Sequence, residues 1–323
     1  MVFLILNTLF NPATFKISIM SLSSKSNDST FDRTKTRYIF IALILFYLIF
    51  SFIYGVLVGF FPGIPDFEDP IVNQILYICS FGSLCYYLWK KLRQSRLNPQ
   101  YLIGNKFPRY RWWSLLGLAI ILLLFSVGAA LLSFYALSLV APNFMESFME
   151  SLAEQESKVS SLPTVDKCLE TINYIVVAPI TEEFVFRGVL LHRLATKWNI
   201  AIAIWISSII FGLMHPNPVG ISMLGVVWAL LYIKTKTLIV PIVAHAINNT
   251  IVVVWQFLGT FVENNGSITE ATEISSQDWI IGLLLVAVSL PFLIRFIYRR
   301  FPAKSQTLPY FANEAEAIAE IPE

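Results

Sequence analysis

Charged residues are scarce in this chain of 323 amino acids: Asp, Glu, Lys and Arg make up 14% of it, whereas a soluble globular protein has about 25%. Hydrophobic residues make up 56%, which is too many for a water-exposed surface of normal size. Three cysteines are too few for a disulfide framework, and a net charge of +2 provides no basic face for nucleic acid. The 26 Phe, 13 Tyr and 8 Trp exclude a disordered chain. These absences leave a membrane protein with several helical spans.

Eight segments could be membrane-spanning helices, each of which needs about 20 mainly apolar residues. Four are almost purely apolar, namely 38–61, 71–89, 112–140 and 279–297. Four others are short or interrupted by polar residues, namely 167–186, 200–214, 220–233 and 238–257. Because interrupted helices must face protein or water, we expect the functional site among the second four and scaffold helices among the first.

The basic residues test this count of spans. If the N-terminus is cytoplasmic and eight spans alternate, 21 of the 23 Lys and Arg residues lie on the cytoplasmic side and only Lys158 and Lys167 lie outside. Most acids of the loops lie on the outer side. This bias is the one that orients membrane proteins. The sequence therefore predicts an all-α, polytopic transmembrane helical bundle of about eight spans, an integral membrane protein with both termini cytoplasmic.

The expected organisation has five parts. They are a mostly flexible cytoplasmic tail (1–37), N-terminal scaffold helices (38–165), a catalytic transmembrane core (166–260), an outer loop with the last span (261–300) and a solvated cytoplasmic tail (301–323). The apolar stretch 2–10 lacks the preceding basic residues of a secretory signal peptide. The loop 141–166 is too short and polar to have a core, and no internal repeat or separate soluble domain is visible.

Two adjacent glutamates lie near the end of the interrupted span 167–186. On a helix, Glu183 and Arg187 are four residues apart with the acid first, which favours an ion pair. Glu182 lies about 100° around the helix and has no cation in reach, so it is the carboxylate that could act as a base. The alternative is that both glutamates extend to water beside Arg187 and Arg193 at a cytoplasmic helix end.

All three histidines fall between positions 192 and 245. His215 precedes Pro216, which ends a helix and leaves polar groups for water to reach, although a structural histidine is an open alternative. His245 and Asn249 are one turn apart and share a helix face, as two donors aimed at one acceptor would, or as a polar clamp between helices would. Asn248 lies on another face and is expected only to clamp, and we expect His192 at the membrane interface.

Together these residues predict a hydrolytic site. A carboxylate and an imidazole can activate water for attack on an amide, while imidazole and carboxamide donors stabilise the oxyanion. The order Glu182-Glu183-x-x-x-Arg187, then Phe211-x-x-x-His215, then His245-x-x-x-Asn249 resembles the CPBP (CAAX protease and bacteriocin-processing) family of intramembrane endopeptidases, which includes the type II CAAX prenyl proteases. The resemblance covers roughly 171–254, and the outer spans match only in their general plan.

The resemblance implies a role for each site residue. Glu182 and His215 would activate the attacking water, His245 and Asn249 would form the oxyanion hole, and Glu183 and Arg187 would support the site. No cofactor is expected, because the chain lacks the zincin motif H-E-x-x-H, although a Glu, His and His set holding zinc remains an alternative. The expected partners are membrane lipid and a membrane-associated, possibly lipidated, peptide or protein, with no nucleic acid.

Two other classes of function stay open. A non-catalytic membrane protein that binds peptides, such as an immunity-like protein, could use the same cavity. A proton-coupled secondary transporter could use buried Glu and His residues as coupling groups. The absence of an inverted repeat argues against the transporter.

Overall fold

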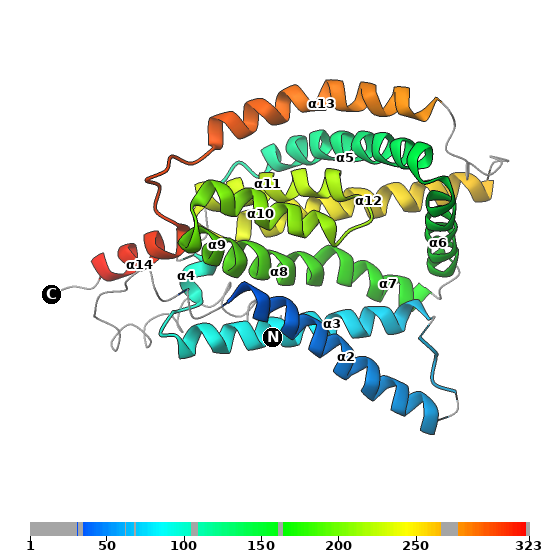
Figure 1. Cartoon of the computed structure of the whole chain (residues 1–323), viewed down its shortest axis with the longest axis horizontal. Helices are drawn as coiled ribbons and strands as arrows, with labels where there is room; N and C mark the ends of the chain where they lie inside the picture. Colours follow the sequence, from blue (N-terminus) through cyan, green and yellow to red (C-terminus); the bar gives the residue numbers. More distant parts are fainter. Residues whose placement is uncertain are drawn as a thin grey trace.

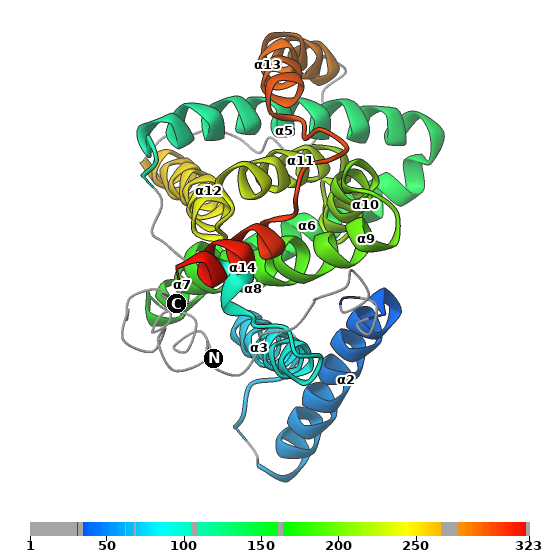
Figure 2. The ribbon, with the colours of Figure 1, turned by 90° about the vertical axis from the view of Figure 1, so that its left-hand side faces the viewer.

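The computed structural model describes residues 31, 35–61, 63–67, 69–104, 109–160, 164–265 and 277–320. Across these ranges the chain is all-α and polytopic, without a β-strand, as the sequence predicts. The helices are stacked in layers, with α13 and α5 along one side, α10, α11 and α12 in the middle, and α3 and α2 on the opposite side (Figures 1 and 2). The apolar stretch 2–10 lies outside the described residues.

The four purely apolar segments form long outer helices close to their expected bounds. They are α2 (Thr36–Phe60), α3 (Pro70–Gln94), α5 (Trp113–Val140) and α13 (Asp278–Arg300). All four are long and apolar enough to cross a membrane. Their composition supports an integral membrane protein.

The interrupted segments form the middle of the bundle. The first is a continuous helix over 164–197, which consists of α7 (Thr164–Ile172), the π-helical Asn173–Val177, α8 (Ala178–Glu183), the π-helical Phe184–Leu190 and α9 (Leu191–Lys197). The others are α10 (Ile200–Leu213), α11 (Pro218–Thr235) and α12 (Ile239–Asn265). Among the described residues, α11 and α12 join the outer helices as six candidate spans, and α10 is shorter. Eight spans with cytoplasmic termini therefore remain a prediction.

Asparagine caps start two of the middle helices. The side chain of Asn199 accepts a hydrogen bond from the Ile202 N–H, and that of Asn217 accepts one from the Gly220 N–H. Pro218 at the first turn of α11 has no N–H that would need a partner. The turn between α10 and α11 therefore has a defined geometry, and it carries His215.

Two glycines allow α5 and α13 to approach closely. A Cβ atom added at Gly128 would lie 2.8 Å from the Gly282 carbonyl oxygen, and one added at Gly282 would lie 3.0 Å from the Gly128 carbonyl oxygen. Small residues at such crossings are typical of membrane helices, where backbone proximity replaces the hydrophobic effect as the source of packing energy. This close approach packs the outer helix α13 against α5.

Two segments expected to be irregular form helices. The loop 141–166 contains α6 (Pro142–Ser160) and the start of α7, and α6 runs across one end of the bundle (Figure 1). The segment after Pro302 is not a solvated tail but forms α14 (Pro309–Ala319), with Tyr310 and Asn313 buried. The Asn313 side chain donates to the carbonyl oxygens of Tyr101 and Lys236, and such specific bonds hold α14 on the bundle.

His192, which we expect at the membrane interface, packs inside the protein. His192 is fully buried, and its Nε2 atom accepts a hydrogen bond from the Tyr310 N–H at 3.2 Å. This N–H belongs to the first turn of α14, where no carbonyl of the same helix is available. The ring also stacks on Phe31 with centroids 5.3 Å apart. His192 therefore joins the end of helix 164–197 to the C-terminal segment.

Candidate active site

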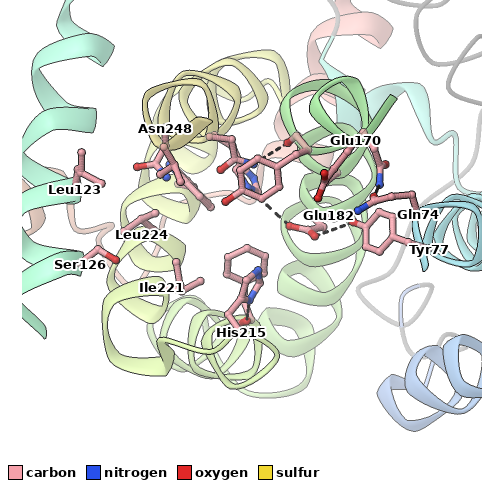
Figure 3. A pocket seen from close by; sticks show the side chains of 18 of the residues that line it. Gln74, Tyr77, Leu123, Ser126, Glu170, Glu182, His215, Ile221, Leu224 and Asn248 are labelled. Atoms are coloured by element: carbon pink, nitrogen blue, oxygen red, sulfur yellow. Dashed lines mark hydrogen bonds and ion pairs between the residues drawn. The ribbon is translucent and has the colours of Figure 1, made fainter. Parts of the chain in front are cut away.

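A cavity of about 410 Å³ lies between α3, α5, α7, α8, α11 and α12, beside the turn that follows α10. Its wall includes Glu182, His215, His245 and Asn249, the four residues for which the sequence predicts catalytic roles. Glu182 and His215 project toward this space from separate elements (Figure 3). Residues distant in sequence are therefore grouped around one cavity.

The Glu182 carboxylate is 8% exposed and has two neighbours. The Tyr77 hydroxyl on α3 donates to its Oε1 atom at 2.8 Å, and the His245 Nε2 atom lies 3.8 Å from its Oε2 atom. The sequence indicates Glu182 as the carboxylate without a cation, but it gives no sign that Tyr77 reaches it across more than one hundred residues. One oxygen is thus bound by a hydroxyl, and the other faces an imidazole.

Glu183 is completely buried and contacts two partners. Its Oε1 atom accepts a hydrogen bond from Arg187 Nη1 at 2.8 Å, which is the ion pair that the four-residue spacing predicts. The same oxygen lies 3.1 Å from His245 Nδ1. The sequence does not predict this second contact, because helix periodicity does not relate residues of different helices. Glu183 links the E-E-x-x-x-R and H-x-x-x-N motifs directly.

Arg187 is surrounded by aromatic rings and is 1% exposed. Its guanidinium carbon lies 4.6 Å from the centre of the Phe211 ring and 5.4 Å from that of Trp228, and Nη2 donates to the Gly225 carbonyl oxygen at 3.2 Å. Cation–π contacts and hydrogen bonds compensate a buried charge in this way. The alternative that both glutamates extend to water beside Arg187 and Arg193 is therefore wrong, because Glu182 is 8% and Glu183 0% exposed.

Hydrogen bonds and ring stacking fix the orientation of both histidines of the cavity. The His245 ring stacks on Trp228 with centroids 4.0 Å apart and planes at 19°. His215 Nδ1 lies 2.8 Å from the Phe211 carbonyl oxygen. Since a carbonyl can only accept, Nδ1 carries the proton and the Nε2 atom of a neutral His215 is left as an acceptor.

Asn249 bonds to the first π-helical segment. Its Nδ2 atom donates to the Tyr174 carbonyl oxygen at 2.8 Å, and a carboxamide nitrogen has a second N–H in addition. A π-helical turn changes the backbone pairing and is frequent at functional sites. Asn248, which is expected only to clamp, also borders the cavity and is 6% exposed. Both asparagines of the pair therefore contribute to its wall.

The donor atoms show no arrangement for a metal ion. Among the residues that the structure describes, no three His, Cys, Asp or Glu side chains are grouped as metal ligands would be. Within the set formed by Glu182, Glu183 and His245, Tyr77 donates to Glu182, Arg187 donates to Glu183, and His245 bonds to Glu183. The Glu183 Oε2 atom has no hydrogen-bond partner among the described residues.

Comparison with known proteins singles out the same region. Residues 164–251 match the family model described as type II CAAX prenyl endopeptidase Rce1-like. The resemblance to the CPBP family is confirmed. The match begins with α7 and ends within α12, and it therefore covers the elements that carry Glu182, Glu183, Arg187, His215, His245 and Asn249.

Two curated relatives agree with the family match. The chain is 40% identical over 84 residues to YdiL of Bacillus subtilis, described as a candidate membrane peptidase, and these residues are 25% of this chain and 34% of YdiL. It is 39% identical over 108 residues to the membrane-embedded CAAX protease MroQ of Staphylococcus aureus, which are 30% of this chain and 41% of MroQ. The matched part thus spans less than half the length of these relatives. No solved structure matches the chain.

Proposed function

We propose that this chain is an intramembrane endopeptidase that hydrolyses a peptide bond in a membrane-associated or lipidated protein or peptide. The family match and the descriptions of the relatives support a membrane protease. The observation that carries the proposal is the joint position of Glu182, His215, His245 and Asn249 around one cavity, with the Glu182 carboxylate bound by no Lys or Arg of the described residues.

Glu182 and His215 would activate the attacking water. Glu182 accepts one proton of this water, and the unprotonated Nε2 atom of His215 accepts a hydrogen bond from the other. The oxygen lone pair is then directed at the carbonyl carbon of the scissile bond. Tyr77 supports this step, because its hydroxyl occupies one oxygen of Glu182 and so leaves the other for the water.

His245 and Asn249 would stabilise the oxyanion that forms on the carbonyl oxygen. With Nδ1–H directed at the Glu183 carboxylate, His245 would donate to the oxyanion from Nε2–H in the form that carries a proton on each ring nitrogen. The second N–H of the Asn249 carboxamide is the other donor. As the tetrahedral intermediate collapses, the proton held by Glu182 passes to the leaving amine, and the carbon–nitrogen bond breaks.

Glu183 and Arg187 would act by positioning. Glu183 holds the His245 ring through Nδ1, and Arg187 holds Glu183 through the buried ion pair. Positioning of this kind converts a side chain into a preorganised donor, which is worth more than the same donor free to rotate.

The substrate is proposed by class only. Glu182 lies close to the cytoplasmic face in the predicted topology, so the cut is expected near that face. Protease-protection mapping of a cleaved substrate measures the side, and a cut on the outer side would contradict this expectation.

The decisive experiment compares the termini of membrane proteins in cells that carry the natural chain or Glu182→Gln. We expect termini that depend on Glu182 and on His245, because removal of the base or of the oxyanion donor costs about two to three orders of magnitude in rate. Identical membrane-protein termini in cells with the natural chain and in cells with Glu182→Gln would contradict the peptidase proposal. A phenotype that persists in Glu182→Gln and in His245→Ala would favour the non-catalytic peptide-binding protein. Uptake into proteoliposomes that depends on a pH gradient, without proteolysis, would favour the transporter.

The proposed reaction needs no metal. A strong chelator added to the purified protein is therefore expected to leave peptidase activity unchanged. Loss of activity that zinc alone restores would assign the Glu and His side chains to a metal centre instead.

A further inference from the structure

Glu170 is a second carboxylate in the wall of the same cavity, and the proposed reaction does not use it. It lies on α7, is half-buried, and projects toward the same space as Glu182 (Figure 3). The described residues offer its carboxylate neither a hydrogen bond nor an ion pair. An acidic side chain in a helix of this apolar bundle needs a reason, because it is costly to place there.

The π-helical segment Asn173–Val177 brings Glu170 onto the face of Glu182. Twelve residues separate the two glutamates, and in an uninterrupted α-helix of about 3.6 residues per turn they would point about 120° apart. A π-helical turn accommodates one extra residue, so twelve residues advance the helix by about eleven α-helical steps, which is close to three full turns. Asn249 holds this segment through its bond to the Tyr174 carbonyl oxygen.

The charge of the cavity favours a cation. Its wall contains two carboxylates, Glu170 and Glu182, and no Lys or Arg among the described residues. Two carboxamides that border it, Asn173 and Asn248, each have a buried oxygen without a hydrogen-bond donor among the described residues. Two carboxylates outnumber the single charge of a doubly protonated His245, and this excess of acceptors and of negative charge selects a ligand that is positive and donates hydrogen bonds.

We infer that Glu170 is a specificity-determining residue that binds a Lys or Arg side chain of the substrate, an inference that rests on the proposed peptidase function. The position of this side chain follows from the helix. Twelve residues of helix rise by at most roughly 18 Å, and an extended peptide covers about 3.3–3.6 Å per residue. The basic residue therefore lies no more than about five residues from the bond that is cleaved.

Quenched fluorescent peptides test the inference on the purified full chain in lipid nanodiscs. Each peptide is N-acetylated, which removes the terminal ammonium as a competing cation, and carries Lys, Gln or Glu at one position. At one position within about five residues of the cut, we expect kcat/KM to be about tenfold higher for Lys than for Gln, mainly through KM, since a charge-assisted hydrogen bond is worth about that much. Glu170→Gln removes this preference, and Glu170→Lys transfers it to the Glu peptide.

Asp166→Asn is the matched control, because it removes one negative charge from the same helix, one turn away, outside the cavity wall. It keeps the preference for Lys. Thermal unfolding of each variant verifies that the fold is intact. A Lys preference that survives Glu170→Gln, or is lost equally in Asp166→Asn, overturns the inference and leaves the peptidase proposal standing.

Binding of the same peptides to Glu182→Gln separates the two proposals. If no peptide is cleaved by the natural chain but the Lys peptide still binds in a manner that depends on Glu170, the peptidase proposal fails and the cation site stands. If the peptides are neither cleaved nor bound with a preference for Lys, both fail.

Discussion

The helix α2 and the continuous helix 164–197 differ in both hydropathy and burial. The most apolar stretch of α2 has a mean hydropathy of 2.7, yet none of its residues is buried in the protein. Helix 164–197 contains Glu182, Glu183 and Arg187, and every residue of its segment Phe184–Leu190 is buried. In this chain the apolar helix is outside and the polar one is inside.

Lipid as the surrounding solvent explains why the apolar helix is outside and the polar helix is inside. A lipid tail is as apolar as a leucine side chain, so an apolar helix loses nothing by facing it, whereas a charged group in lipid has no partner. Helix 164–197 can keep its charges only where other helices supply hydrogen bonds and aromatic rings, as Gly225 and Phe211 do for Arg187. In this protein, the helices with charged side chains are therefore the ones that must be buried. Equal substitutions in the two helices can test this comparison.

Arg187→Ala in the buried helix is expected to have the largest effect on stability. It leaves the completely buried Glu183 without its cation, and such a change costs about 3–5 kcal/mol. Arg37→Ala in α2 removes an exposed arginine whose contact with the Tyr38 hydroxyl is 3.5 Å long, so we expect a change below about 0.5 kcal/mol. Thermal unfolding in one detergent measures both.

The double variant Glu183→Gln with Arg187→Met distinguishes a lost ion pair from lost packing. It removes both charges and keeps much of the volume, so it is expected to be more stable than Arg187→Ala alone. Equal losses of stability in Arg187→Ala and Arg37→Ala would contradict the difference that we draw between the two helices. A double variant as unstable as Arg187→Ala would assign the effect to packing against Phe211 and Trp228.

Gly225→Ala compared with Gly59→Ala gives the next largest difference. A Cβ atom at Gly225 would lie 2.9 Å from the Ser208 Cβ and 3.2 Å from Arg187 Nη2, whereas one at Gly59 in α2 meets nothing within 4 Å. Overpacking of this kind costs about 1–3 kcal/mol. The same substitution in α2 is neutral or slightly stabilising, because alanine is the better helix former. A similar unfolding temperature for both variants would show that α10 and α11 can separate without cost.

Much of the fold follows from the sequence, because hydropathy alone locates membrane helices. All eight segments expected as spans are helices, and α5 starts one residue from its expected bound. The π-helical stretches, α6 and α14 could not be predicted in this way. α6 is too polar to resemble a span, and α14 depends on contacts with distant residues such as His192 and Tyr101.

In the candidate site, the sequence likewise predicts contacts within one helix but not those between helices. Spacing within one helix predicts the ion pair of Glu183 with Arg187 and separates Glu182 from it. It could not predict that Glu183 also binds His245, that Tyr77 reaches Glu182 from α3, or that a π-helical turn aligns Glu170 with Glu182. These contacts depend on how the helices pack against one another, and the spacing of residues within one helix does not predict which helix lies beside it.

Phe52→Ala in α2 is expected to have the smallest effect. The Phe52 side chain is 74% exposed, so in detergent or lipid its contacts are mainly with hydrocarbon, which also solvates the alanine. We expect the free energy of unfolding to change by less than about 0.5 kcal/mol. Phe186→Ala is the matched control, because Phe186 is 2% exposed and packs on Phe211 with ring centroids 5.0 Å apart. Its loss leaves a cavity and costs about 3–5 kcal/mol. If Phe52→Ala is as damaging as Phe186→Ala, α2 has a protein neighbour, such as a second copy of the chain, where we have assumed lipid.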